Sequence, residues 1–110
     1  MLSKMKQYTT IEQTAKLIEL GFEMPKNIES HDGYWGYDYA YSIGELFSFL
    51  PKVISNEKFD YATINIFHDT INWVVGYEDT DGVMRFITSD IELIDVLCTL
   101  CRKLKAEGVI

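Results

Sequence analysis

Two cysteines and two histidines are the residues of this sequence best suited to metal or redox chemistry. Cys98 and Cys101 form a C-x-x-C pair, while His31 and His68 are each followed by an aspartate. A closed zinc site needs four ligands, and these histidines lack the paired spacing of such sites. Redox motifs place the first cysteine at a helix N-terminus, whereas Cys98 lies well inside an apolar helical pattern. We therefore expect two free, buried thiols and no metal site.

The sequence lacks the other catalytic motifs that usually accompany a histidine acting in acid–base catalysis. Adjacent residues do not face each other, so a histidine followed by an aspartate is not by itself a catalytic pair. The sequence contains no nucleophile elbow, no phosphate-binding glycine loop and no paired-carboxylate motif. We predict that the protein is not an enzyme and binds no cofactor. A small-molecule or enzymatic site, if there were one, would draw on His68, Asp69, Trp73 and Tyr77.

Aromatic residues are densest between residues 33 and 41, which read Gly-Tyr-Trp-Gly-Tyr-Asp-Tyr-Ala-Tyr without a basic residue. In an extended chain Tyr37, Tyr39 and Tyr41 would share one side. Tyrosine and tryptophan are enriched at protein interfaces, but the same rings also suit a small hydrophobic core. If this segment faces solvent, its binding residues are Tyr34, Trp35, Tyr37, Asp38, Tyr39 and Tyr41.

The charge of the chain argues against one class of partner. The 110 residues carry a formal net charge of -7, and between residues 27 and 101 the only basic side chains are Lys52, Lys58 and Arg85. A phosphate backbone would be repelled, so we expect no direct nucleic-acid binding.

The apolar runs are far shorter than the roughly 20 residues of a membrane span, and two cysteines are too few for a disulfide scaffold. We predict a single domain over residues 1–110, in the cytoplasm.

Three helices are predicted from apolar spacing and from a Ser or Thr followed three residues later by Glu, the pattern of a capping box. The first helix spans about residues 10–20, the second starts after residue 42 and ends at Pro51, and the third ends before Gly108. The expected capping pairs are Thr9 with Glu12, Ser42 with Glu45, and Ser89 with Glu92.

Alternating residues rich in β-branched and aromatic side chains predict strands at 61–67, 71–77 and 83–88. In the first strand Ala62, Ile64 and Ile66 form an apolar face that a helix should cover, and the other face is mixed. Residues 22–41 are expected to form a long irregular connection. The fold class is therefore α+β, a three-stranded antiparallel meander backed by helices in the order α-α-β-β-β-α.

Five segments also carry a resemblance to other proteins. These are Thr10 to Gly21, the aromatic and acidic segment, Tyr41 to Pro51, the strand with Trp73, and the closing helix up to Gly108. Through them the chain resembles small uncharacterised proteins of phages and mobile elements of gut Bacteroidetes. That group has no assigned activity, so the resemblance implies a biological context and no mechanism.

Together these observations predict an accessory protein that binds another protein through its aromatic and acidic segment. An alternative hypothesis is an acidic nucleic-acid mimic that inhibits a DNA-binding protein or nuclease, with binding that weakens steeply as salt rises. A homodimer is a third arrangement that the sequence allows, because a meander leaves an edge strand open to pairing.

Overall fold

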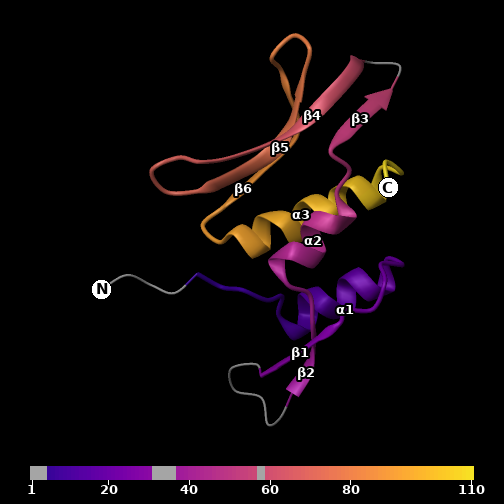
Figure 1. Cartoon of the computed structure of the whole chain (residues 1–110), viewed down its shortest axis with the longest axis vertical. Helices are drawn as coiled ribbons and strands as arrows, with labels where there is room; N and C mark the ends of the chain where they lie inside the picture. Colours follow the sequence, from indigo (N-terminus) through magenta and orange to yellow (C-terminus); the bar gives the residue numbers. More distant parts are fainter. Residues whose placement is uncertain (1–4, 31–36, 57–58) are drawn as a thin grey trace.

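The computed structural model describes residues 5–30, 37–56 and 59–110 (Figure 1). The elements follow in the order α1 (Ile11–Glu19), β1 (Asn27–Ser30), β2 (Tyr37–Ala40), α2 (Ile43–Phe49), β3 (Val53–Asn56), β4 (Phe59–His68), β5 (Trp73–Asp79), β6 (Met84–Asp90) and α3 (Leu93–Ala106). Strands β3 to β6 form one four-stranded antiparallel sheet in chain order, and β1 pairs with β2 in a separate two-stranded sheet. The predicted α+β class is confirmed, but the prediction of a three-stranded meander is wrong.

The fourth strand of the large sheet, β3, follows directly from the end of α2. Pro51 disfavours a helical conformation in the residue before it, and Leu50 is accordingly extended, with φ -93 and ψ 125. The chain then continues as a strand whose Val53 lies opposite Thr63 of β4. Four residues are too short to show an alternating pattern, which is why the sequence did not reveal this strand.

A second hairpin occupies part of the segment that was expected to be irregular. Strands β1 and β2 pair with Asn27 opposite Ala40 and Ser30 opposite Tyr37. The hairpin packs beside α1, at the end of the molecule opposite the four-stranded sheet (Figure 1). The expectation of an irregular connection over residues 22–41 is therefore wrong for these two strands.

The helix caps agree with the sequence at one of three positions. Ser42 and Glu45 form the predicted capping box of α2. In α1 the box is one residue later, because Thr10 is the N-cap and pairs with Gln13. Helix α3 starts after Glu92 without a side-chain cap, so the predicted cap at Ser89 is wrong.

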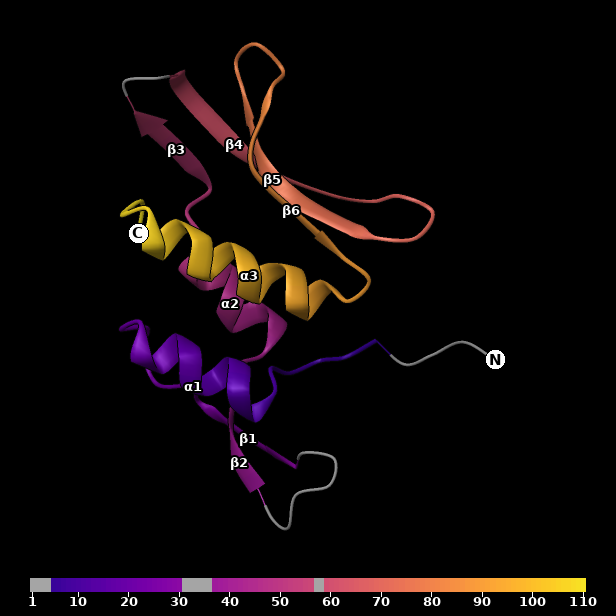
Figure 2. The ribbon, with the colours of Figure 1, turned by 180° about the vertical axis from the view of Figure 1, so that it is seen from behind.

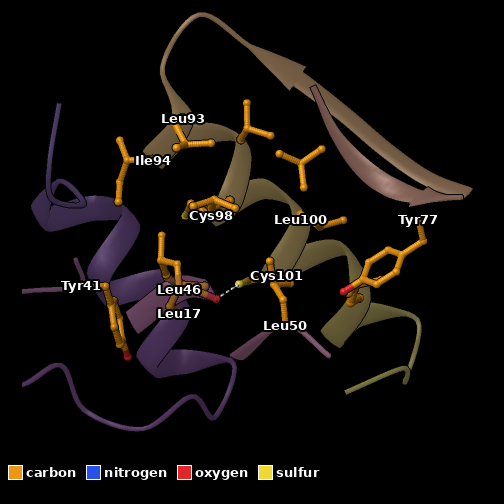
Figure 3. Close-up of a cluster of buried hydrophobic side chains, with 14 of the residues drawn as sticks. Leu17, Tyr41, Leu46, Leu50, Tyr77, Leu93, Ile94, Cys98, Leu100 and Cys101 are labelled. Carbon is orange, nitrogen blue, oxygen red and sulfur yellow. Dashed lines mark hydrogen bonds between the residues drawn. The ribbon is translucent and has the colours of Figure 1, made fainter. Parts of the chain in front are cut away.

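The hydrophobic core lies on both sides of α3. Helix α3 packs against β5 and β6 on one side and against α2 and α1 on the other (Figure 2). On the sheet, Ala62, Val75 and Tyr77 are fully buried. The expectation that a helix covers the apolar face holds for the part beneath α3, but Ile66, which was predicted to lie on that face, is 36% exposed. The Tyr77 side chain points into the core (Figure 3), and its hydroxyl donates to the carbonyl of Pro51 at 2.7 Å. The molecule is flat, with extents of 49 × 37 × 17 Å.

None of the helices in the described ranges combines the length and the apolar character needed to cross a bilayer.

Candidate protein-interaction surface

The sheet has a second face that no helix of the described ranges covers (Figure 2). Residues directly opposite each other on paired strands point to the same side. Since Ile64 pairs with Tyr77 and Val75 pairs with Thr88 toward α3, the alternate positions point away from it. We call this surface the open face; it comprises Val53, Tyr61, Thr63, Asn65, Phe67, Val74, Glu78, Met84 and Ile87.

Four large apolar side chains on the open face are about half exposed, whereas Val74 on the same face is 7% exposed. The exposed fractions are 53% for Val53, 51% for Tyr61, 45% for Phe67 and 48% for Ile87. Single exposed apolar residues are common on proteins, but several of them on one face indicate a contact surface. These four lie on three strands of one sheet, so their exposure is a property of the face.

A β-bulge in β6 positions Ile87 on this face. The register shifts between Val75 and Tyr77, so that two residues of β6 lie opposite Gly76. Phe86, in the bulge, has a φ of 53, and its ring meets that of Tyr77 edge to face on the core side, with 6.5 Å between centroids. The bulge thus turns Phe86 into the core and leaves the next side chain exposed.

Gly76 is required by this bulge. A Cβ at this position would lie 3.1 Å from the Cα of Ile87 and 3.2 Å from the carbonyl oxygen of Arg85. Both distances are shorter than ordinary van der Waals contacts, and both atoms belong to the backbone. The absent side chain therefore lets β6 approach β5 closely at the bulge.

Carboxylates border the open face at the strand ends. Asp69 in the β4–β5 turn and Asp81 in the β5–β6 turn are exposed. The backbone N–H groups of Asn72 and Ile71 donate to Asp69 and hold the pKa of its carboxyl below the usual range. The border of the open face is therefore negatively charged at neutral pH.

Asp79, at the end of β5, is a carboxylate with a structural role. Its side chain is nearly inaccessible, and it accepts from the backbone N–H groups of Asp81 and Val83 and from Nε of Arg85, each at 2.9 Å. The N–H of Val83 first, then Arg85 and Asp81, lower the pKa of this carboxyl. This network closes the β5–β6 turn.

The aromatic segment predicted from the sequence is only partly visible in the structure. Tyr34 and Trp35 lie outside the described residues. Tyr37 and Asp38 belong to strand β2, and the structure describes the backbone of these two residues only. Tyr39 is 44% exposed, as the binding hypothesis requires of it.

Tyr41 is buried, so the expectation that it shares an exposed side with Tyr39 is wrong. Strand β2 ends at Ala40, and the chain then turns toward the cap of α2, which breaks the alternation of sides. The Tyr41 hydroxyl donates to the carbonyl of Glu23, and its N–H donates to Oγ1 of Thr9 at 2.9 Å. Burial raises the pKa of Tyr41 to about 12. Tyr41 belongs to the core (Figure 3).

The two cysteines are buried and free, as predicted. The thiol of Cys101 lies 3.6 Å from the carbonyl oxygen of Leu46, to which it donates (Figure 3). Burial raises the pKa of Cys98 to about 11 and that of Cys101 to about 12. Within the described ranges no three His, Cys, Asp or Glu side chains are grouped so that they could hold a metal ion.

The residues named for a small-molecule site do not converge. His68 and Trp73 touch edge to face, with 4.8 Å between ring centroids, near the β4–β5 turn. The Asp69 carboxylate accepts from backbone N–H groups of that turn, and Tyr77 is buried in the core. His68, Asp69 and Trp73 therefore lie at the β4–β5 turn, whereas Tyr77 is buried apart from them. His31 lies outside the described residues.

Comparison with family profiles, with curated proteins and with solved structures finds no match for this chain.

Proposed function

We propose that this protein is a non-enzymatic accessory protein that binds another protein, and that the open face is its principal contact surface. The observation that supports this is the exposure of four large apolar side chains, each about half accessible, on the uncovered side of one sheet. Interfaces bury apolar and aromatic side chains at their centre and keep polar groups at the rim. The open face has this composition, with Phe67 and Ile87 as anchors.

The charge at the border specifies the kind of partner. Asp69 and Asp81 are exposed in the turns that border the open face, whereas the basic Arg85 is paired with Asp79 at the β5–β6 turn. A partner surface with apolar side chains surrounded by lysine and arginine complements this pattern. A second copy of the chain would bring the same carboxylates to the same rim, which disfavours a homodimer through two open faces.

The nucleic-acid mimic hypothesis receives less support, because several acids have roles in folding. Glu45 caps α2, and Asp79 closes a turn. Asp95 accepts from Lys6 Nζ at 2.9 Å and from Gln13 Nε2 at 2.7 Å, and so joins the N-terminal segment and α1 to α3. These carboxylates account for part of the acidic composition without any phosphate-like array.

The aromatic and acidic segment remains a second proposed contact. Tyr39 is exposed, and its hairpin lies at the end of the molecule away from the sheet (Figure 1). A contact there is separate from the open face, so alanine variants of Trp35 and Tyr37 test it independently.

The experiment is a quantitative affinity capture from the native host, read by mass spectrometry, with three variants. We expect the double variant Phe67→Ser/Ile87→Ser to lose the partner while its melting temperature stays close to that of the wild type, because both side chains are already half exposed. The matched control is Met24→Ser, since Met24 is 55% exposed in the connection between α1 and β1, outside the large sheet. The third variant, Trp35→Ala/Tyr37→Ala, tests the aromatic segment.

The outcomes separate the two surfaces. Loss of the partner only with the open-face variant supports the proposal, and loss only with Trp35→Ala/Tyr37→Ala assigns binding to the aromatic segment instead. Equal capture by the wild type and the open-face variant would refute the role of the open face. Capture of a basic DNA-binding protein, lost steeply with salt and unaffected by either variant, would favour the mimic hypothesis.

A further inference from the structure

The open face contains a pocket of about 360 Å³ between β4 and β5. Its walls are formed by Tyr61, Thr63 and Asn65 of β4 and by Glu78 and Thr80 at the end of β5. Thr63 lies directly opposite Glu78, and Asn65 lies opposite Gly76. The pocket is therefore a consequence of the sheet register.

The polar atoms of this pocket are arranged to accept hydrogen bonds. Asn65 Nδ2 donates to Oε2 of Glu78 at 3.0 Å, and this bond holds the carboxylate in place. The bond uses the amide nitrogen of Asn65, so its side-chain carbonyl oxygen can still accept a hydrogen bond. Within the described part of the chain, Glu78 forms no ion pair. The hydroxyl groups of Thr63 and Thr80 add two further acceptors. Asp79 also lines the pocket, but its carboxylate is paired with Arg85 at 2.9 Å. Among the described residues, Glu78 is therefore the carboxylate of the pocket that has no salt-bridge partner.

The aromatic wall of the pocket is Tyr61, which is 51% exposed. An exposed aromatic ring beside a carboxylate attracts cations through the electrostatics of its face. A phosphate or carboxylate ligand would be repelled by Glu78, and a purely apolar group would leave the carboxylate unpaired. A ligand that suits both Tyr61 and Glu78 is a flat cation with several N–H donors.

We propose that this pocket receives an arginine side chain of the partner protein, with its guanidinium paired to Glu78 and stacked on Tyr61. The proposal deepens the proposed function and rests on it. Arginine fits better than lysine, because a guanidinium is planar, donates two parallel hydrogen bonds to a carboxylate and stacks on an aromatic ring. The arginine lies at the polar end of the open face, while Phe67 and Ile87 bind apolar groups of the same partner.

The test is an NMR titration of the ¹⁵N-labelled full chain with N-acetyl-arginine N-methylamide. We expect saturable shifts of the amides of residues 61–65 and 78–80 at millimolar concentrations. The citrulline analogue has nearly the same shape without the charge and should cause no saturable shift there. Glu78→Gln, which keeps an acceptor for Asn65, should weaken arginine binding about tenfold or more, because a charge-assisted pair is lost.

The matched control is Glu12→Gln, which removes an equal charge from an exposed position of α1. It should bind arginine as the wild type does, so that a local effect is distinguished from one of net charge. Equal shifts with citrulline, an unaffected Glu78→Gln variant or the absence of shifts at the pocket would each overturn the proposal. Equal affinity for the lysine analogue would overturn the assignment to arginine.

The arginine titration and the capture experiment test separate claims, so either proposal can be refuted without the other. If arginine does not bind but Phe67→Ser/Ile87→Ser abolishes capture, the open face binds a partner without an arginine in this pocket. If arginine binds and Glu78→Gln is defective, but the open-face variant captures the partner normally, the pocket stands and the proposed role of the open face does not.

Discussion

Replacement of Gly76 by alanine should destabilise the sheet through a contact that can be worked out from the structure. The new Cβ would lie 2.9 Å from Met84 Cε, 3.1 Å from Ile87 Cα and 3.2 Å from the carbonyl oxygen of Arg85. The methionine end can rotate away, but the two backbone atoms can retreat only if the bulge opens. Overpacking of this kind typically costs 1–3 kcal/mol, so we expect about 2 kcal/mol.

Urea unfolding followed by circular dichroism measures this cost. About 2 kcal/mol corresponds to a midpoint roughly 1 M lower in urea and a melting temperature about 8 °C lower. The matched control is Gly44→Ala in α2, where the nearest atom to a new Cβ is Ser42 Oγ at 3.9 Å. Alanine is the better helix former, so this variant should gain about 0.5–1 kcal/mol. A Gly76→Ala protein as stable as the wild type would refute the close approach of β5 and β6 at the bulge.

Two further predictions concern titrating groups. Because burial raises the pKa of Cys98 to about 11 and that of Cys101 to about 12, both thiols should react with Ellman's reagent at about pH 8 only in urea; rapid labelling of the native protein would contradict their burial. The pKa of Asp79 is lowered by the N–H of Val83 and by Arg85, so its stabilisation is complete above the unfolded pKa of about 3.9 and is lost as pH falls through the lower folded value. Asp79→Asn should therefore be less stable at neutral pH and lose less stability on acidification, as urea unfolding at several pH values will show; an acid limb as steep as that of the wild type would contradict this role.

The sequence revealed the elements whose pattern is local and long. Helix α3 and strands β4 to β6 have enough periodic residues for the pattern to be clear. Strands β1, β2 and β3 have only four residues each, and pairing with a neighbour makes them strands. The bulge at Phe86 could not be predicted either, because no sequence pattern indicates a positive φ at a phenylalanine.

The candidate site was predictable only in part for similar reasons. Alternation along β4 indicated that Tyr61, Asn65 and Phe67 share a mixed face, but their grouping with Glu78 depends on the register across the turn. Tyr41 was misplaced because the alternation rule was extended past the end of β2. The exposure of the open face depends on where the helices pack, and the local sequence pattern of a strand does not predict this.

The position of α3 has a consequence for synthesis of the chain in the cell. This helix packs against the inner side of the large sheet, yet it follows all six strands in chain order. While a ribosome makes the protein, the sheet lacks its inner cover until the residues of α3 have emerged. During that interval both faces of the nascent sheet expose apolar side chains, and the growing chain is then most open to chaperones and to aggregation.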